Sequence, residues 1–475
     1  MLSPKSVNIL EICMVGAAHD SKSGTDTTLE FSPTFFELEY FRLPPSACLF
    51  FFKLTDSNPT VFHSEIIPKL KQSLSHTLLR FLPIVSCLTW PPHSSRPIFA
   101  YNSKNDAVSF TVAESDDDFD RLAGSGIREA ADSHPYSPQL AATETKAPLL
   151  ALQVTLFPNK GFCIGMETHH AMFDGKSASM FFRAWAYTCK YIVGKGEAPL
   201  LFPEDITPSF DWSTIKDSEG LEDVYLNLWV SMGKKLDSGL ESNPRSVKPF
   251  SKLDVQPNLL RATFQLTTED IKKLRESVLN YHHPAETDPT ERLNLSTYVL
   301  ACSYASVCQV KARGGDTDRE VYFLWSADCR SRLDPPLPPN HFGDTVLIYH
   351  IVCKAGDFMQ ENGVAIIAKK LSDSIKRMEK GLLEGSKERL GLLFSLGAEV
   401  QRIGFAGSTG IQFYNTNFGW GNVVKVELSS IDRAGLFSVM DTGNGSDLRI
   451  EIGVALTSSE MEFFASFFYN GLQVM

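Results

Sequence analysis

The sequence concentrates its candidate chemistry in one short stretch, His169-His170-Ala171-Met172-Phe173-Asp174-Gly175. An imidazole exchanges a proton near neutral pH, so a histidine held at the end of a hydrophobic element is a candidate general base. Two adjacent histidines, followed by an aspartate and a glycine, are more specific than a single histidine. We therefore predict that His170 is the base, with Asp174 and Gly175 beside it.

Other kinds of site fit this stretch less well. A zinc site needs further ligands at workable spacing, and none lies nearby in the sequence, so we predict no metal. A serine nucleophile needs a G-x-S-x-G elbow. The nearest candidate, Ala406-Gly407-Ser408-Thr409-Gly410, lacks the first glycine. General-base catalysis without a covalent intermediate is the catalytic option that we favour.

A second candidate motif is Asn417-Phe418-Gly419-Trp420-Gly421. Two glycines that flank a tryptophan permit tight bends and a close approach of the backbone. Taken alone, the motif is equally well interpreted as an aromatic turn between two elements.

The hydrophobic pattern places the histidines in a connection between a strand and a helix. Residues 149–157 and 162–168 alternate on either side of Pro158-Asn159-Lys160-Gly161. This predicts a hairpin whose second strand ends at His169 and His170. From Gly175 to about residue 194, apolar residues recur on one helical face, which predicts a helix. A loop between two such elements would present its side chains to a cleft.

The rest of the chain mixes strands and helices. Residues 195–250 are polar and interrupted by prolines, which is typical of a linker, with one predicted helix at 221–236. The second half restarts with a strand at 260–266, a helix to 279 and a helix from about 296 to 311. Further strands are predicted at 321–326, 346–352, 423–428, 436–440 and 448–455. A helix is also predicted at 64–81 in the first half.

Composition narrows the class of protein. The 475 residues exceed one ordinary core, and 43% hydrophobic with 21% charged residues is typical of a globular chain. A net charge of -11 without a basic cluster argues against nucleic-acid binding. An odd number of cysteines, nine, with no CxxC pair indicates reduced thiols and a cytoplasmic location. No apolar run approaches ~20 residues, so we expect no membrane span.

Together, HHxxxDG and FGWG resemble the motifs of the plant BAHD acyl-CoA-dependent acyltransferases. The resemblance extends over nearly the whole chain. It is strongest to the branch of the family that acylates anthocyanins, flavonoids and other phenolic glycosides. The segments that carry it are Thr34-Phe35-Phe36-Glu37-Leu38, Phe81-Leu82-Pro83, Leu88-Thr89-Trp90-Pro91, Glu114-Ser115-Asp116, Asp118-Phe119-Asp120, Cys329-Arg330-Ser331-Arg332-Leu333 and Pro335-Pro336-Leu337-Pro338.

The resemblance implies an α/β fold with two chloramphenicol-acetyltransferase-like domains, each a mixed sheet flanked by helices. Residues 1–194 would form the N-terminal domain, 195–250 a crossover linker and 251–475 the C-terminal domain, with segments exchanged between the domains. A solvent channel between them would admit acyl-CoA from one face and the acceptor from the other, with His170 in the middle. The family pattern implies a monomer that uses acyl-CoA as a co-substrate and needs no cofactor.

The implied activity is O-acyl transfer from acyl-CoA to a sugar hydroxyl of a phenolic glycoside. His170 would take the hydroxyl proton, and the indole N–H of Trp420 would stabilise the tetrahedral oxyanion. Malonyl and hydroxycinnamoyl donors are both used in the branch; we favour malonyl, with Lys176 and Arg183 as candidate partners for its carboxylate. Alternatives are a non-catalytic metabolite-binding relative and an enzyme for a different alcohol. A peptide-synthetase condensation domain shares HHxxxDG but lacks FGWG.

The resemblance also assigns supporting residues. Asp174 would pair with an arginine and serve geometry rather than proton transfer. The acyl-CoA would contact Ser296 and Thr297 at a helix start, which is equally well interpreted as a simple N-cap. The other candidate contacts of acyl-CoA are Lys252, Gly419 and Gly421.

The chain departs from the family pattern at two positions. Asn417 replaces an aspartate that pairs, in the family, with the arginine corresponding to Arg330. Asp344 stands where the family has asparagine. Our hypothesis is that Asp344 supplies the missing negative charge to Arg330, since an uncompensated buried guanidinium is costly.

Overall fold

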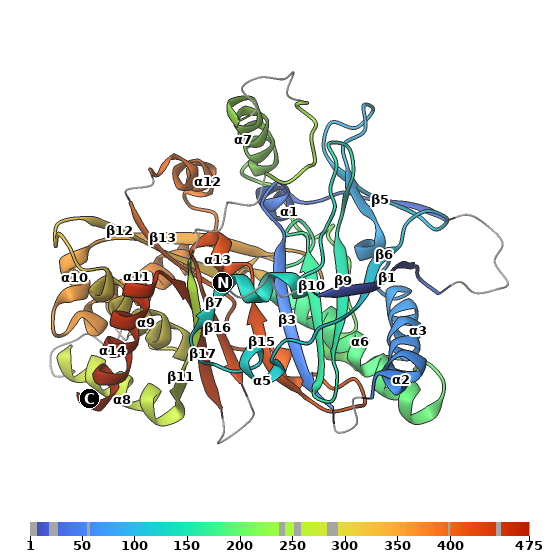
Figure 1. The fold of residues 1–475 in the computed structure, drawn as a ribbon. Coiled ribbons are helices and arrows are strands. Elements are labelled where there is room, and N and C mark those ends of the chain that lie inside the picture. Colours follow the sequence, from blue (N-terminus) through green and yellow to red (C-terminus); the bar gives the residue numbers. More distant parts are fainter. Residues whose placement is uncertain are drawn as a thin grey trace.

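The structure is a computed structural model that describes residues 7–18, 27–54, 58–236, 243–250, 258–282, 293–397, 400–442 and 448–474. Two mixed β-sheets lie side by side, and helices cover them on the outside (Figure 1). The expected α/β class is confirmed.

The first sheet follows the strand order β1-β6-β9-β10-β3-β15. Its strands are β1 (Asn8–Val15), β3 (Ser46–Lys53), β6 (Val108–Glu114), β9 (Leu150–Phe157), β10 (Gly161–Thr168) and β15 (Val423–Leu428). β9 and β10 form the predicted hairpin, and all of their residues are buried. Helices α3 (Ile67–Leu78) and α6 (Gly175–Lys195) pack against each other. The rings of Phe182 on α6 and Phe50 on β3 stack, with centroids 3.8 Å apart, so α6 lies directly on the sheet.

The second sheet follows the order β13-β12-β14-β16-β17-β11-β7. Its strands are β7 (Arg128–Glu129), β11 (Leu260–Thr267), β12 (Glu320–Asp328), β13 (Val346–Lys354), β14 (Gln401–Ala406), β16 (Phe437–Thr442) and β17 (Arg449–Leu456). Its helices are α8 (Thr268–Tyr281), α9 (Thr297–Arg313), α10 (Ala355–Met359), α11 (Gly363–Lys380) and α14 (Ser458–Val474). α9 is buried along its whole middle because it packs between α11 and α14.

The two halves of the chain exchange strands. β15, from the second half, pairs with β3 in the first sheet, and β7, from the first half, pairs with β11 in the second. Charged side chains join the exchanged strands, because Arg128 on β7 and Arg261 on β11 both contact the buried Glu427 of β15. Each half is therefore completed by a segment of the other.

A smaller sheet and several short elements complete the fold. The sheet follows the order β2-β5-β4-β8, with β2 (Thr28–Phe31), β4 (Cys87–Thr89), β5 (Ile98–Asn102) and β8 (Ala147–Pro148). The remaining elements are α1 (Phe35–Tyr40), α2 (Pro59–Val61), η1 (Phe62–Ile66), α4 (Leu82–Val85), α5 (Phe119–Leu122), η2 (Ala130–Tyr136), η3 (Glu204–Ile206), α7 (Leu221–Leu236), η5 (Arg330–Arg332), α12 (Ser386–Ser395), η6 (Phe413–Asn415) and α13 (Ile431–Ala434). α7, the helix predicted in the linker, packs against α1 and α12 at the top of Figure 1.

One predicted helix starts and ends earlier than expected. The helix predicted at 64–81 begins at Pro59 in α2, passes through the π-helical turn η1 and ends with α3 at Leu78. Pro68 lacks the N–H that an α-helix would donate to the carbonyl of Ser64, and the wider turn η1 lies just before this proline.

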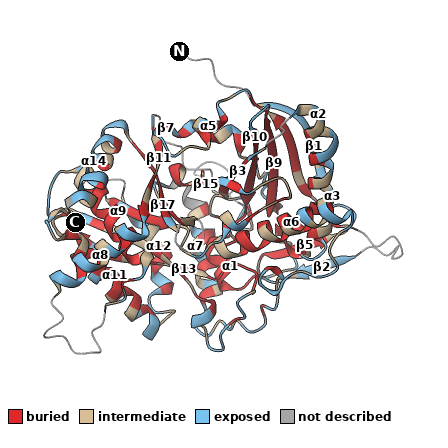
Figure 2. Cartoon of the chain, turned by 90° about the horizontal axis from the view of Figure 1, so that it is seen from below, coloured by how far each residue is buried: buried red, intermediate tan, exposed pale blue. Residues whose placement is uncertain are grey.

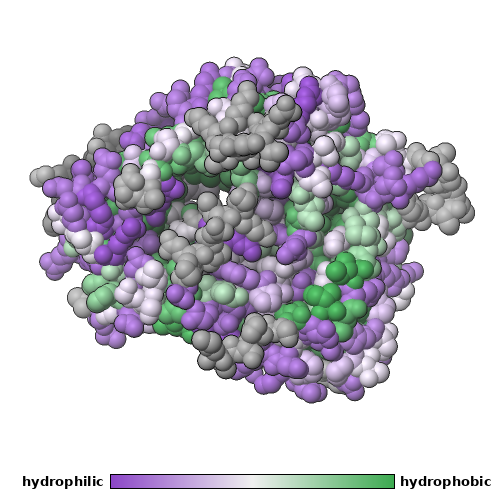
Figure 3. Space-filling view, turned by 45° about the horizontal axis from the view of Figure 1, so that its top comes forward, coloured by the Kyte–Doolittle hydropathy of each residue, from purple (hydrophilic) through white to green (hydrophobic). Residues whose placement is uncertain are grey.

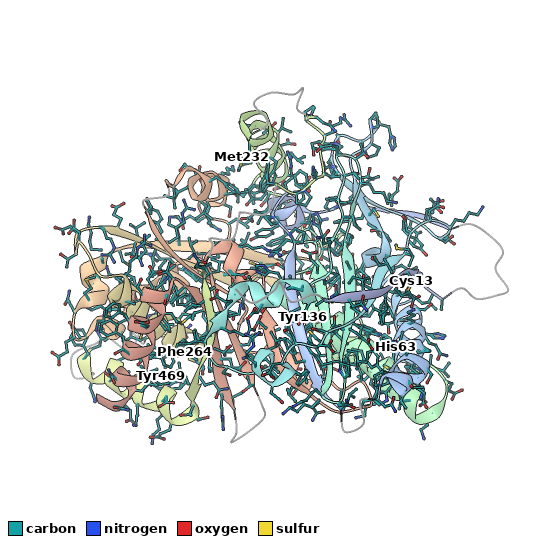
Figure 4. All side chains as sticks on the ribbon, in the orientation of Figure 1. Cys13, His63, Tyr136, Met232, Phe264 and Tyr469 are labelled. Atoms are coloured by element: carbon teal, nitrogen blue, oxygen red, sulfur yellow. The ribbon has the colours of Figure 1, made fainter. Side chains whose placement is uncertain are left out.

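The core runs without interruption through both halves. Buried residues fill the strands and the inner faces of the helices, and exposed residues lie on the outside (Figure 2). Hydrophilic side chains cover most of the face seen in Figure 3. Tyr136 lies near the middle of the molecule (Figure 4), where its hydroxyl donates to Asp117 at 2.7 Å. No helix within the described ranges is long and apolar enough to span a membrane, and all nine cysteines are free thiols.

Candidate active site

The His170 loop, residues 169–175, is a tight turn between β10 and α6. It closes when the amides of Met172 and Phe173 donate to the carbonyl of His169. Asp174 then caps α6 by accepting a hydrogen bond from the amide of Ser177 at 2.7 Å, as side-chain oxygens at an N-cap commonly do. Gly175 follows at a crowded point, since a Cβ there would lie 2.6 Å from Cδ1 of Ile411.

Asp174 has a structural role, because its carboxylate is paired with Arg330. Its Oδ2 lies 2.7 Å from Nη1 of Arg330, and both side chains are almost wholly buried. Burial would raise the pKa of Asp174, but the charge and hydrogen bond of Arg330 lower it below its ordinary value. Arg330 also bonds to the carbonyls of His341 and Gly343 and to Asp328. The expected pairing of Asp174 with an arginine is present, and it ties the His170 loop to the second half.

Asp344 binds His170 rather than Arg330. Its Oδ2 lies 2.7 Å from Nδ1 of His170, and its Oδ1 accepts the amide of Val346 at 3.1 Å. Among the described residues, no ion pair joins Asp344 to Arg330, which has Asp174 and Asp328 as partners instead. The hypothesis that Asp344 compensates Arg330 is therefore wrong.

The pair shifts the proton affinity of both groups. Burial alone would lower the pKa of His170, but the hydrogen bond and the charge of Asp344 outweigh burial and raise this pKa above its ordinary value. Burial raises the pKa of Asp344 to about 6, against the opposite effect of His170. Nδ1 is the ring nitrogen occupied by Asp344, so Nε2 is the atom left to act as the base.

The neighbouring histidine has a different role. His169 is fully buried, and its Nδ1 accepts the amide of Ala171 at 3.1 Å. Burial, with a smaller contribution from the charge of His170, lowers the pKa of His169 to about 3. It is therefore a neutral structural residue, and only His170 of the pair reaches solvent, with a side chain that is 30% exposed.

His170 lines a cavity of ≈ 420 Å³ between the two halves. The first half contributes residues from α1, β3, β10 and α6, and the second half residues from β12, β13, β14 and β16. Among them are Ser46, Thr168, Lys176, Trp325, Ser408 and Met440. A second cavity of ≈ 530 Å³ shares Lys176, Gly410 and Ile411 with the first and also contacts Arg183. The two cavities therefore adjoin at these shared residues, and the first one contains the imidazole of His170 in its lining.

Tyr40, the last residue of α1, is a site residue that sequence patterns did not predict. Its ring packs on the imidazole of His170 with centroids 5.0 Å apart, and its hydroxyl donates to the carbonyl of Val346 at 2.8 Å. Tyr40 therefore holds the imidazole from one side while Asp344 holds it from another. No motif could reveal this contact, because it depends on how α1 docks between the halves.

The Trp420 loop, residues 416–422, lies far from His170. A Cβ on Gly419 would meet Val193 near the end of α6, and a Cβ on Gly421 would approach the carbonyl of Lys53 at the end of β3. His170 lies at the opposite ends of both elements, next to Gly175 and Ser46. At 1.5 Å per helical residue the separation along α6 is about 27 Å. The prediction that Trp420 stabilises the oxyanion at His170 is therefore wrong, whereas the contact of Gly419 and Gly421 with acyl-CoA stays a prediction.

Asn417 stabilises its own loop. Its Oδ1 accepts the amide of Gly419 at 2.8 Å, and its Nδ2 donates to Asn422 at 2.8 Å. No hydrogen bond or ion pair joins it to Arg330 among the described residues, so the expectation that residue 417 lies beside this arginine near His170 is wrong. The physical reason is that the loop folds on itself to let Gly419 and Gly421 adopt positive φ angles.

Ser296 and Thr297, two other residues predicted to contact acyl-CoA, form no direct bond with His170 in the described part of the chain. Ser296 caps α9 by accepting the amide of Val299 at 3.3 Å, and Thr297 is the first residue of that helix. Their contact with the phosphates stays a prediction. Lys252 lies outside the described residues.

Comparison with known proteins identifies relatives along the whole chain. Residues 6–470 match the model of the Transferase family. Phenolic glucoside malonyltransferase 1 of Arabidopsis thaliana is 36% identical over 476 residues, which is 100% of both chains. Agmatine coumaroyltransferase of the same plant is 36% identical, over 92% of this chain and 94% of the relative.

Solved structures show the same fold at low identity. Vinorine synthase superposes with a TM-score of 0.61 at 18% identity, covering 96% of each chain. TRI101 of F. graminearum, solved with coenzyme A and T-2 mycotoxin, gives a TM-score of 0.62 at 13% identity, over 92% of this chain and 96% of that one. The family match over residues 6–470, together with relatives at 36–37% identity over nearly the whole chain, shows that the chain belongs to the BAHD acyl-CoA-dependent acyltransferases.

Proposed function

We propose that this chain transfers a malonyl group from malonyl-CoA to a sugar hydroxyl of a phenolic glycoside, with His170 as the general base. The observation that carries the proposal is the placement of His170. Its imidazole opens into the cavity between the halves while Nδ1 is occupied by Asp344. Nε2 is thus available for the proton of an acceptor.

In the proposed reaction, the proton of the acceptor hydroxyl moves first to His170 and then to the sulfur of CoA. As the acceptor oxygen attacks the thioester carbonyl carbon, Nε2 of His170 takes the hydroxyl proton. The tetrahedral oxyanion must find donors in the cavity around His170, which excludes Trp420. When the intermediate collapses, the C–S bond breaks, and His170 returns the proton to the CoA thiolate. No acyl-enzyme is required.

The malonyl preference is supported by Lys176. This residue lines both cavities, and its Nζ lies 3.7 Å from Asp328, a loose pairing that leaves the ammonium able to turn toward a ligand. Arg183, the other candidate, is paired with Asp205 and lines only the second cavity. Lys176 is therefore the better partner for a malonyl carboxylate.

The relatives support the same donor and also define the alternative. A second Arabidopsis relative, phenolic glucoside malonyltransferase 2, is 38% identical over 92% of this chain. The relative named agmatine coumaroyltransferase stands at similar identity. An aromatic donor or an amine acceptor is thus the outcome that the assay has to exclude. We also infer, from the free thiols, that the enzyme works in the cytoplasm, and we expect a monomer.

The test is transfer by the purified full-length chain, followed by mass spectrometry of the products. Malonyl-CoA, acetyl-CoA and p-coumaroyl-CoA are each supplied with a panel of flavonoid and simple phenolic glucosides and with agmatine. We expect malonylated glucosides, and no product with His170→Ala. Transfer from p-coumaroyl-CoA alone, or to agmatine alone, would contradict the proposal. Absence of any transfer would favour a non-catalytic relative.

Lys176→Met tests the donor contact, with Lys190→Met on the exposed side of α6 as the matched control. We expect the KM for malonyl-CoA to rise about 10-fold or more, since a hydrogen bond to a charged group contributes ~1.5–3 kcal/mol. The KM for acetyl-CoA, which lacks the carboxylate, should stay unchanged. Equal effects on both donors would remove Lys176 from malonyl recognition.

A further inference from the structure

Asp344 joins the two halves of the molecule at the candidate base. It precedes β13 in the second half, whereas His170 follows β10 in the first half. The Asp344 side chain is wholly buried, and both of its oxygens are used, one by the Nδ1 of His170 and the other by the amide of Val346. The carboxylate therefore has a fixed orientation before any substrate arrives.

We propose that Asp344 is a positioning residue that forms an Asp–His dyad with His170, fixing the tautomer with Nδ1–H and stabilising the imidazolium during acyl transfer. The inference rests on the proposed function, because it assigns a partner to the base of that reaction. A carboxylate on one ring nitrogen directs the lone pair of the other toward the substrate.

Among the groups near His170, Asp344 is the one whose carboxylate binds Nδ1 of the imidazole. Asp174 also faces the imidazole, but its charge is compensated by Arg330. The Tyr40 hydroxyl donates to the carbonyl of Val346, so Tyr40 offers His170 only the face of its ring. Burial, with a smaller contribution from the charge of His170, keeps His169 a neutral imidazole.

Two further carboxyl groups on α1 act on Asp344 from a distance. Burial raises the pKa of Glu37 and of Glu39 to about 8, so both carboxyls are protonated at neutral pH. Arg389 faces Glu39 and partly offsets its burial. Asp344 is then the ionised group in contact with His170 between about pH 6 and 8.

The proton balance needs no other group. The acceptor proton moves to Nε2 while the C–O bond forms, and the Nδ1 proton stays in the hydrogen bond to Asp344. The positive imidazolium is stabilised by the carboxylate until the C–S bond breaks and Nε2 returns its proton to sulfur. Asp344 itself gains no proton in the cycle.

The first test is the pH profile of kcat/KM for the wild type and Asp344→Asn. Only the neutral imidazole is a base, so the profile should rise with pH through the pKa of His170. Loss of the carboxylate charge should move this acid limb to lower pH by about one unit, because an adjacent opposite charge shifts a pKa by about 1–3 units. The plateau should fall about 10-fold or more. An unmoved limb would overturn the dyad.

Asp432→Asn is the matched control. Asp432 is also buried and bonds to a histidine, His134, at 2.7 Å, but it lies outside both cavities. We expect this variant to lose thermal stability without moving the acid limb. If it moves the limb as much as Asp344→Asn does, the effect is a general one of weakened packing and the proposal falls.

A titration of ¹⁵N-histidine resonances separates the dyad from the proposed reaction, because it needs no substrate. The His170 signal is assigned by its loss in His170→Gln. We expect the Nδ1–H tautomer and a pKa above 6.5 in the wild type, and a lower pKa in Asp344→Asn. Turnover with an Nε2–H tautomer, or with an unshifted pKa, would overturn the dyad. The expected signals without turnover from any donor would support the dyad and refute the transferase reaction.

Discussion

The His170 loop and the Trp420 loop contact the same two elements, β3 and α6, at opposite ends. The His170 loop leads into Gly175 at the start of α6 and faces the cavity beside Ser46. The Trp420 loop packs on Val193 and Lys53, close to where the two elements end. One loop is joined to the other half by charged contacts, whereas the other is closed by bonds within itself.

The comparison shows that one conspicuous motif lies at the cavity, whereas the other packs against structural elements away from it. The His170 loop keeps a partly exposed imidazole against a cavity, and its neighbours are buried charges. The Trp420 loop directly precedes β15, the strand that the second half donates to the first sheet, and its glycines pack against α6 and β3. We therefore expect changes in the first loop to affect catalysis, and changes in the second to affect stability alone.

The largest expected effect is in the charged network of the His170 loop. Arg330→Met would leave the carboxylate of Asp174 buried without its partner, and breaking one member of a buried ion pair costs about 3–5 kcal/mol. We expect urea denaturation to show this loss in the free energy of unfolding. A loss below about 1 kcal/mol would contradict a role for the pair in joining the halves.

Glycine replacements sharpen the comparison directly. Gly419 has φ +110°, and a Cβ there would lie 3.2 Å from Val193, so Gly419→Ala should lower stability by about 1–3 kcal/mol. Its kcat per folded molecule should be unchanged. Gly175→Ala would instead displace the end of the Ile411 side chain, which lines the cavity, and should change KM. The reverse pattern would contradict the division between the loops.

Buried acids near the His170 loop predict a pH-dependent stability. The pKa of Glu37 is about 8 in the folded protein, so the folded state binds more protons than the unfolded state between about pH 4.5 and 8. Wild-type stability should therefore fall as pH rises through that window. Glu37→Gln removes this term and should raise Tm at pH 8 and leave it unchanged below pH 4. A difference in Tm that does not depend on pH would contradict this account.

The smallest expected effect is in the Trp420 loop itself. Asn417→Ala removes two hydrogen bonds in a half-buried turn and should lower the free energy of unfolding by about 1 kcal/mol. The pH profile of the reaction should be unaffected. A change in the profile would link this loop to His170.

Local patterns predicted the elements that hold the base. Alternation gave the β9–β10 hairpin, and helical spacing gave α6, because both depend on residues close in sequence. The placement of His170 at their junction followed from the same two patterns.

Contacts between distant segments could not be predicted in this way. The bond between His170 and Asp344 spans 174 positions, and the contact of Arg330 with Asp174 depends on how the halves dock. The expectation for Trp420 was wrong for the same reason, since a glycine-rich turn can bring a backbone close to any neighbour. Its neighbours are Val193 and Lys53 rather than the cavity.

The most direct test of the account compares His170→Ala with Trp420→Phe in the same transfer assay, with kcat/KM measured for one donor and one acceptor. We predict a loss of at least about 100-fold per folded molecule for His170→Ala, because general-base catalysis contributes that much. Trp420→Phe should stay within about 3-fold of the wild type, since a missing oxyanion donor would cost ~100-fold or more. A comparable loss in both variants would contradict the assignment of catalysis to the His170 loop alone.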